Sequence, residues 1–147
     1  MITRLSMLLL MILALPGLIS SAGAAPADDS RFVYTDAFVQ AKMFKSDCVG
    51  IACAHTEEFG TARRAAKDDQ AIVPYLEQRF QQAPRAGQVY IALVIRAHDR
   101  AKGEALLREL AQVRTETVDT MFGCVIAPER LDQLAGEYLR DSNFSFD

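Results

Sequence analysis

The stretch Gln88–Val113, QVYIALVIRAHDRAKGEALLRELAQV, decides the fold, because its first part is compatible with two structures. Val89–Ile95 (VYIALVI) is an unbroken apolar run, which suits a buried strand or the middle of a buried helix. Its β-branched residues favour a strand. Lys102–Val113, however, contains good helix formers with apolar side chains on one side, and the short connection suits a helical hairpin. The sequence therefore predicts an all-α fold, with an α+β fold in which Val89–Ile95 is a buried strand as the alternative.

Apolar residues recur at the helical period on both sides of this stretch. Pro128 is well placed for the first turn of a helix, where a missing N–H costs nothing. The other predicted helices cover Arg31–Phe44, a segment from Asp68 to about Gln82, a short segment from Thr115 or Thr117 to Phe122, and a last segment from Pro128 to Leu139.

The first 24 residues have the pattern of a cleavable secretory signal peptide. Arg4 supplies a positive charge, and Leu5–Ile19 carries no ionisable side chain. This run is too short for a membrane span, which needs about 20 apolar residues. Small residues follow, and they predict cleavage after Ala24, which would leave 123 of the 147 residues. We therefore expect a periplasmic or secreted protein that meets the membrane only through its transient signal peptide.

These segments predict a simple domain organisation. A chain of this length after cleavage is enough for one hydrophobic core. The predicted parts are a signal peptide over 1–24, a short polar leader over 25–30, a single helical domain over 31–140 and a flexible tail over 141–147.

The charge balance argues against a nucleic-acid partner. The chain has 16 Lys and Arg against 19 Asp and Glu, a net charge of −3, and cleavage would remove Arg4 and leave −4. Binding to phosphates requires clustered Lys and Arg. A mildly acidic surface suits solubility, and it also suits contact with a basic partner.

Three cysteines, Cys48, Cys53 and Cys124, remain after cleavage. In an oxidising compartment two of them are expected to form a disulfide and to leave one over. Residues five apart in a continuous helix are too far apart for a disulfide, so Cys48 and Cys53 can pair only if the helix ends or is interrupted between them, which Gly50 would allow. Cys53 and Cys124 would instead close a long loop, and the sequence leaves both pairings open.

No pattern in the chain indicates a catalytic or cofactor site, so none is predicted. His55 and His98 are too scattered to suggest a zinc site. They lie near Glu57-Glu58 and Asp99 respectively, and each is most simply a surface or helix-end residue. A hydrolase that uses an acidic residue with one of these histidines is the enzymatic alternative.

Four residues are candidates for an interface with another protein: Tyr75, Tyr90, Arg96 and Arg100. Tyrosine and arginine are the types that contribute most at such interfaces. The simpler interpretation places the tyrosines in the core and the arginines on solvated helix faces.

Asp69–Leu76 (DQAIVPYL) resembles the second helix of a HEAT-like hairpin repeat, and a shift of 31 residues places Asp68 on Asp99 and Leu76 on Leu107. The resemblance implies antiparallel helical hairpins in a small bundle or a HEAT-like stack that binds proteins on its concave face.

In size, export and helical character the chain is also similar to periplasmic immunity proteins of the type VI secretion amidase kind. That similarity implies inhibition by plugging the active site of a partner enzyme, which needs no catalytic residue. We therefore expect an exported, non-enzymatic protein-binding domain. The alternatives are the hydrolase described above and a structural envelope protein without a fixed ligand.

Overall fold

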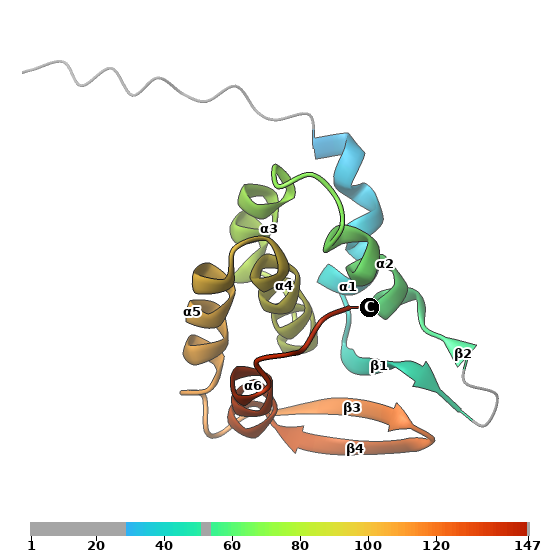
Figure 1. The fold of residues 1–147 in the computed structure, drawn as a ribbon. Helices are drawn as coiled ribbons and strands as arrows, with labels where there is room; N and C mark the ends of the chain where they lie inside the picture. The colour runs from blue at the N-terminus through green and yellow to red at the C-terminus, as the bar shows by residue number, and fades with distance from the viewer. Residues whose placement is uncertain (1–28, 51–53, 147) are drawn as a thin grey trace, which may run out of the picture.

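The computed structural model describes residues 29–50 and 54–146, and here the chain forms helices and a four-stranded sheet (Figure 1). No helix in these ranges is long and apolar enough to cross a membrane. The predicted signal peptide lies outside the described residues. The elements in chain order are the 3-10 helix η1 (Asp29–Thr35), α1 (Asp36–Val39), β1 (Met43–Val49), β2 (Ala54–His55), α2 (Glu57–Ala65), α3 (Ile72–Phe80), α4 (Arg85–His98), α5 (Arg100–Leu110), β3 (Thr117–Gly123), β4 (Val125–Arg130) and α6 (Leu131–Arg140).

The prediction of an all-α bundle or HEAT-like stack is wrong, since the fold is α+β. The predicted alternative has the right class but the wrong strand, because Val89–Ile95 is helical and lies inside α4. Every residue from Ala86 to Arg96 is buried. Other helices surround α4, and β1 contacts it as well. A helix buried on all sides carries apolar residues on all sides, which explains the unbroken run.

Two segments that were expected to be helical are strands. The predicted helix Arg31–Phe44 is divided into η1, α1 and the start of β1, and the predicted short helix up to Phe122 is β3. In β3 exposed residues alternate with Val118 and Thr120, which are buried. This period of two belongs to a strand with one covered face. The last helix begins at Leu131, so that Pro128 lies in β4 instead of in a helical turn.

The sheet has the strand order β2-β1-β3-β4. Strands β1 and β3 are parallel, and Phe44 is paired with Thr120, while the other two pairs of neighbouring strands are antiparallel. Gly123 ends β3 with φ +60°, a left-handed conformation that glycine adopts at low cost in a tight hairpin turn. The side chains of Phe44 and Thr120 are buried beneath the helices.

Helices α4 and α5 form the expected helical hairpin, with Asp99 between them. The Asp99 carboxylate accepts a hydrogen bond from the Lys102 N–H and caps α5. Gly103 faces α4 so closely that a Cβ at this position would lie 2.3 Å from the Arg96 Cα. The contact between the two helices therefore requires glycine at this position.

Tyr90 connects α4 to the sheet. Its ring is fully buried, with its centroid 4.6 Å from that of Phe44. The hydroxyl donates to the Lys45 carbonyl (2.8 Å) and accepts from the Lys45 N–H (3.0 Å). One side chain thus satisfies both main-chain groups of a residue in β1.

The chain after α6 runs across α4 to α2 (Figure 1). Arg96 donates from Nη1 to the Tyr138 carbonyl (2.6 Å) and from Nη2 to the Asp141 carbonyl (2.7 Å) at the C-terminal end of α6. Phe146 is 3% exposed, and its carbonyl accepts from the Arg63 Nε at 2.6 Å. These contacts hold the segment 141–146, which we call the tail, against the helices.

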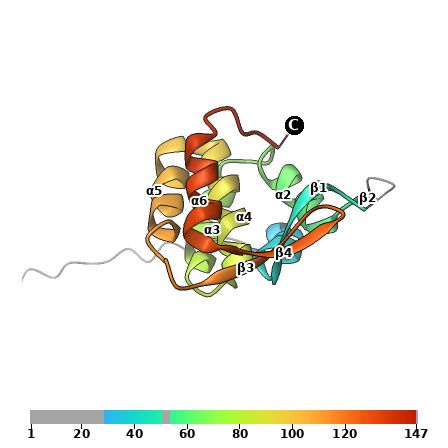
Figure 2. The same ribbon diagram turned by 90° about the horizontal axis from the view of Figure 1, so that it is seen from below.

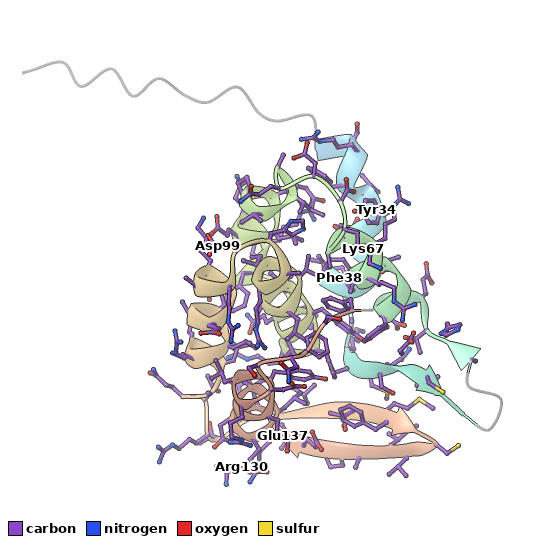
Figure 3. All side chains as sticks on the ribbon, in the orientation of Figure 1. Tyr34, Phe38, Lys67, Asp99, Arg130 and Glu137 are labelled. Atoms are coloured by element: carbon purple, nitrogen blue, oxygen red, sulfur yellow. The ribbon has the colours of Figure 1, made fainter. Side chains whose placement is uncertain are left out.

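Glu129 in β4 offers a test of the packing between the sheet and α6. Its Oε2 is buried without a hydrogen-bond partner among the described residues. Burial raises the pKa of this carboxyl, and the charge of Glu137 on α6 raises it further (Figure 3). The raised pKa means that ionisation of Glu129 destabilises the folded state, so stability is lost as the pH rises past the ordinary glutamate pKa of about 4.3.

We therefore expect Glu129→Gln to increase the free energy of unfolding at pH 7, with the difference from the parent protein vanishing below about pH 4. Urea unfolding at pH 3.5 and pH 7 measures both values. Equal stability of the two proteins at pH 7 would contradict the prediction.

Candidate protein-binding surface

Exposed apolar side chains gather on the β3–β4 hairpin. Among the described residues, the exposed large hydrophobic side chains are Val33 on η1 and three on this hairpin. Phe122 is 38% exposed, Val125 66% and Ile126 61%. Cys124 between them is also exposed. We call these four neighbouring residues, Phe122, Cys124, Val125 and Ile126, the hairpin surface.

The strand register places these side chains on both faces of the hairpin. Phe122 is opposite Val125, whereas Ile126 is opposite Met121. Because neighbouring residues of a strand point to opposite faces, the two pairs lie on opposite sides. The Phe122 ring centroid is 6.3 Å from that of the buried Phe44, so this side chain of the hairpin surface also contacts the core.

The hairpin extends from α6 with its turn at the far end (Figures 1 and 2). There the Gly50 N–H donates to the Gly123 carbonyl at 2.8 Å, which ties the end of β1 to the hairpin turn. The hairpin surface therefore lies on an ordered projection rather than on a free loop.

The open edge of β4 is poorly suited to bind another strand. The Leu131 N–H donates to the Glu116 carbonyl at 3.0 Å, in register with the β3–β4 pairs. Hydrogen-bonded and non-hydrogen-bonded pairs alternate along an antiparallel ladder, so the nitrogen of Pro128 falls on the open edge. Proline has no N–H to offer there. A partner would therefore bind to the side chains of the hairpin rather than to its backbone.

His55 lies beside a carboxylate, but the carboxylate is Asp47 rather than Glu57 or Glu58. Its Nδ1 is 3.0 Å from Asp47 Oδ1, and Arg63 donates to Asp47 Oδ2 at 2.6 Å. Burial acts to raise the pKa of Asp47, but the hydrogen bonds from His55 and Arg63 outweigh it and keep this pKa below its ordinary value. The His55 side chain is 69% exposed. The group is thus an ion-pair cluster open to water.

Glu57 and Glu58 lie in the first turn of α2, where the positive end of the helix dipole stabilises acidic side chains. Glu58 also forms an ion pair with Lys45, at 2.6 Å between Oε1 and Nζ. Both observations describe structural roles for these acids.

His98 at the end of α4 lies next to Asp99 in the sequence but bonds elsewhere. Its Nε2 is 2.8 Å from the Ala65 carbonyl of α2. A carbonyl only accepts, so this nitrogen carries the proton and links two helices. No group of three or more His, Cys, Asp or Glu side chains that could hold a metal ion is found in the part of the chain that the structure describes.

Three of the four predicted interface residues are in the interior. Tyr75 is 4% exposed, Tyr90 has no exposed surface and Arg96 is 8% exposed. Arg100 is on the surface, where it forms an ion pair with Glu104 at 2.8 Å. Tyr75, Tyr90 and Arg96 therefore hold the helices and the sheet together.

The predicted disulfide between Cys53 and Cys124 is wrong, because Cys124 is a free, exposed cysteine at the hairpin turn. Cys48 and Cys124, the cysteines within residues 29–50 and 54–146, are not joined to each other. The pairing of Cys48 with Cys53 stays a prediction, because Cys53 lies outside the described residues.

The hairpin surface is not among the predicted sites, because the segment from Thr115 or Thr117 to Phe122 was expected to be a helix. A signal was present: Gly123-Cys124 separates two short runs rich in β-branched and apolar residues, Thr117–Phe122 and Val125–Ala127. Two such runs joined by two residues that include glycine are typical of a β-hairpin.

No family model matches the chain, and no curated protein or solved structure matches it either. The resemblances to HEAT-like repeats and to periplasmic immunity proteins therefore stay predictions. The function has to be inferred from the chain's own surface.

Proposed function

We propose that this chain is an exported protein-binding domain, of the inhibitor or immunity kind, that contacts its partner through the hairpin surface. The observation that carries the proposal is the gathering of Phe122, Val125 and Ile126 on one projecting hairpin. Contiguous exposed apolar groups of this kind mark interaction sites on soluble proteins. Aromatic side chains are also enriched in the centres of interfaces.

A projecting sheet edge with exposed apolar side chains suits a concave partner. A hairpin with apolar side chains on both faces can enter a cleft and lose water on both sides. Full burial of a Val or Ile side chain contributes about 1.5–3 kcal/mol. Blocking an active site in this way requires affinity and shape but no catalytic residue. This agrees with the sequence, which offers no catalytic pattern.

Export is the part of the proposal that depends on the sequence pattern of residues 1–24 alone. The charged start, the short apolar run and the small residues before Ala25 support it. The partner would then be a protein of the same compartment.

The proposal is tested by a double substitution in the hairpin surface, Val125→Ser with Ile126→Ser. The full chain, with an affinity tag after Asp147, is expressed in its native host and recovered with its bound proteins, which mass spectrometry identifies. We expect the double variant to recover at least tenfold less of the partner, because about 1.4 kcal/mol of lost contact energy gives that factor. The mass of the recovered chain reports cleavage after Ala24 in the same experiment.

Val33→Ser is the matched control, because Val33 on η1 is 56% exposed and lies outside the hairpin surface. It should recover as much partner as the parent protein. Equal losses in both variants, or recovery of the parent chain without any partner at micromolar concentration, would overturn the proposal.

The hydrolase ranks second, and the observation in its favour is the hydrogen bond between His55 and Asp47. A general base also has to lie within hydrogen-bond reach of a substrate proton and remain free to accept it. His55 is exposed, and Asp47 is already engaged by Arg63. The pair is therefore better explained as part of a surface ion-pair cluster.

A further inference from the structure

A cavity of about 170 Å³ lies between the tail and helices α4 and α5. Its wall combines two arginines, two serines and two phenylalanines with Leu93 and Ala97. We call this cavity the tail pocket. The residues of the tail pocket come from α4, α5 and the tail, whereas the hairpin surface lies on β3 and β4. The six residues that give it its character are Arg96, Arg100, Ser142, Ser145, Phe144 and Phe146.

The tail pocket is cationic. Among residues 29–50 and 54–146, its wall contains Arg96 and Arg100 but no Asp or Glu. The two donors of Arg96 described above bind main-chain carbonyls at the end of α6, and Arg96 is 8% exposed.

The carboxylates of Glu104, Asp99 and Asp141 bind other groups. Glu104 binds Arg100 at 2.8 Å and Arg108 at 2.8 Å, so one carboxylate serves two arginines. The hydrogen bond from Arg100 lowers the pKa of Glu104, and the charges of Arg100, Arg108 and Arg96 lower it further. The carboxylates of Asp99 and Asp141 accept main-chain N–H groups of nearby residues. Three arginines therefore surround Glu104, and none of these three carboxylates lines the cavity, whereas Arg96 and Arg100 do.

The rest of the wall is apolar and matches a small organic group. The ring centroids of Phe144 and Phe146 are 5.2 Å apart, and Leu93 of α4 also lines the cavity. A cavity of about 150 Å³ is known to be large enough for benzene. A second cavity of about 330 Å³ shares Ala97 and the tail residues 144–146 with the tail pocket, and its wall adds Lys67 (Figure 3). In the part of the chain that the structure describes, this second wall also contains no Asp or Glu.

We propose that the tail pocket binds a small organic carboxylate whose apolar part is about the size of one aromatic ring. The guanidinium of Arg100 would bind the carboxylate, with the charge of Arg96 beneath it. The two phenylalanine rings would contact the apolar part. Planar guanidinium groups match the two oxygens of a carboxylate, and the apolar wall favours an organic acid over an inorganic anion.

The test is a titration of the purified full chain with sodium phenylacetate, followed by calorimetry and by backbone amide NMR. We expect saturable binding with a dissociation constant of about 1 mM or lower, as is usual for a ligand of ten non-hydrogen atoms. The amide signals of Ala97 and Phe144 should shift. Acetate, which lacks the ring, and 2-phenylethanol, which lacks the charge, should each bind at least tenfold more weakly, and inorganic phosphate likewise.

Arg100→Gln should weaken phenylacetate binding at least tenfold. Arg108→Gln is the matched control, because Arg108 binds the same Glu104 and is similarly exposed, at 59% against 63% for Arg100, but does not line the cavity. Binding that is not saturable, equal losses in the two variants, or tighter binding of phosphate or phenylethanol would overturn the proposal.

Discussion

Replacing Gly103 with alanine is expected to lower the free energy of unfolding by about 3 kcal/mol, the upper end of the usual range for overpacking. A Cβ at this position would lie 2.3 Å from the Cα, Cβ and N of Arg96. Two of these atoms belong to the backbone of α4 and cannot rotate away. The substitution would therefore push α5 away from α4 and disturb the buried face of both helices.

Gly60→Ala is the control for this substitution. Gly60 lies inside α2, and no atom lies within 4 Å of a Cβ built there. Alanine should raise the stability at this position by about 0.5–1 kcal/mol, because it is the better helix former. Urea unfolding with equal m-values measures both changes. A Gly103→Ala protein as stable as the parent would show that the two helices are not in close contact.

Replacing Tyr90 with alanine is expected to cost about 3–5 kcal/mol, the range for removing a large aromatic side chain from a core. The ring is completely buried and contacts Phe44 and Phe38. The substitution also leaves both main-chain groups of Lys45 without the hydroxyl that they bind. Thermal or urea unfolding measures the loss.

Tyr90→Phe separates the hydroxyl from the ring. It should cost about 1–3 kcal/mol, since part-buried main-chain groups lose their partner. Tyr34→Phe is the matched control, because its hydroxyl binds Asp68 at the surface, at 2.6 Å. We expect a loss of about 0.5 kcal/mol for this exposed pair. Equal losses in the two Phe variants would contradict the role of Tyr90 as a link between α4 and β1.

The parts of the fold that could be predicted are those specified by neighbouring residues. Helices α3 and α5 lie where the 3.6-residue pattern places them, and the short connection at Asp99, which favoured a helix for Val89–Ile95, forms the helical hairpin. The N-cap at Asp99 and the apolar side of α5 involve residues within a few positions of each other. Such local interactions are visible in a sequence.

The pairing of β1 with β3 could not be predicted in the same way. β1 and β3 are adjacent in the sheet, although more than 60 residues separate Phe44 from its partner Thr120. Segments with both apolar and polar residues become strands when a neighbouring strand forms hydrogen bonds with their main-chain groups. The sequence alone does not show which distant segment will be that neighbour. The apolar period in Arg31–Phe44 was therefore assigned to one helix, although Phe44 belongs to the sheet.

The candidate sites depended on burial in a similar way. Tyr75 and Tyr90 have the residue type of interface anchors, and the fold buries both. Val125 and Ile126 have the residue type of a core, and the fold exposes them at the end of a hairpin. A side chain's chemistry is the same in both places, and only its neighbours decide whether it meets water.

By itself, the sequence determined the apolar content of α4, the hairpin of α4 and α5, and the export pattern of the first 24 residues, because these are properties of contiguous residues. The tertiary structure alone decided that β1 joins β3, that three apolar residues remain exposed at the hairpin, and that Arg96 and Arg100 line one cavity. Each of these depends on contacts between distant segments, whose free energy is gained only when the whole chain has folded.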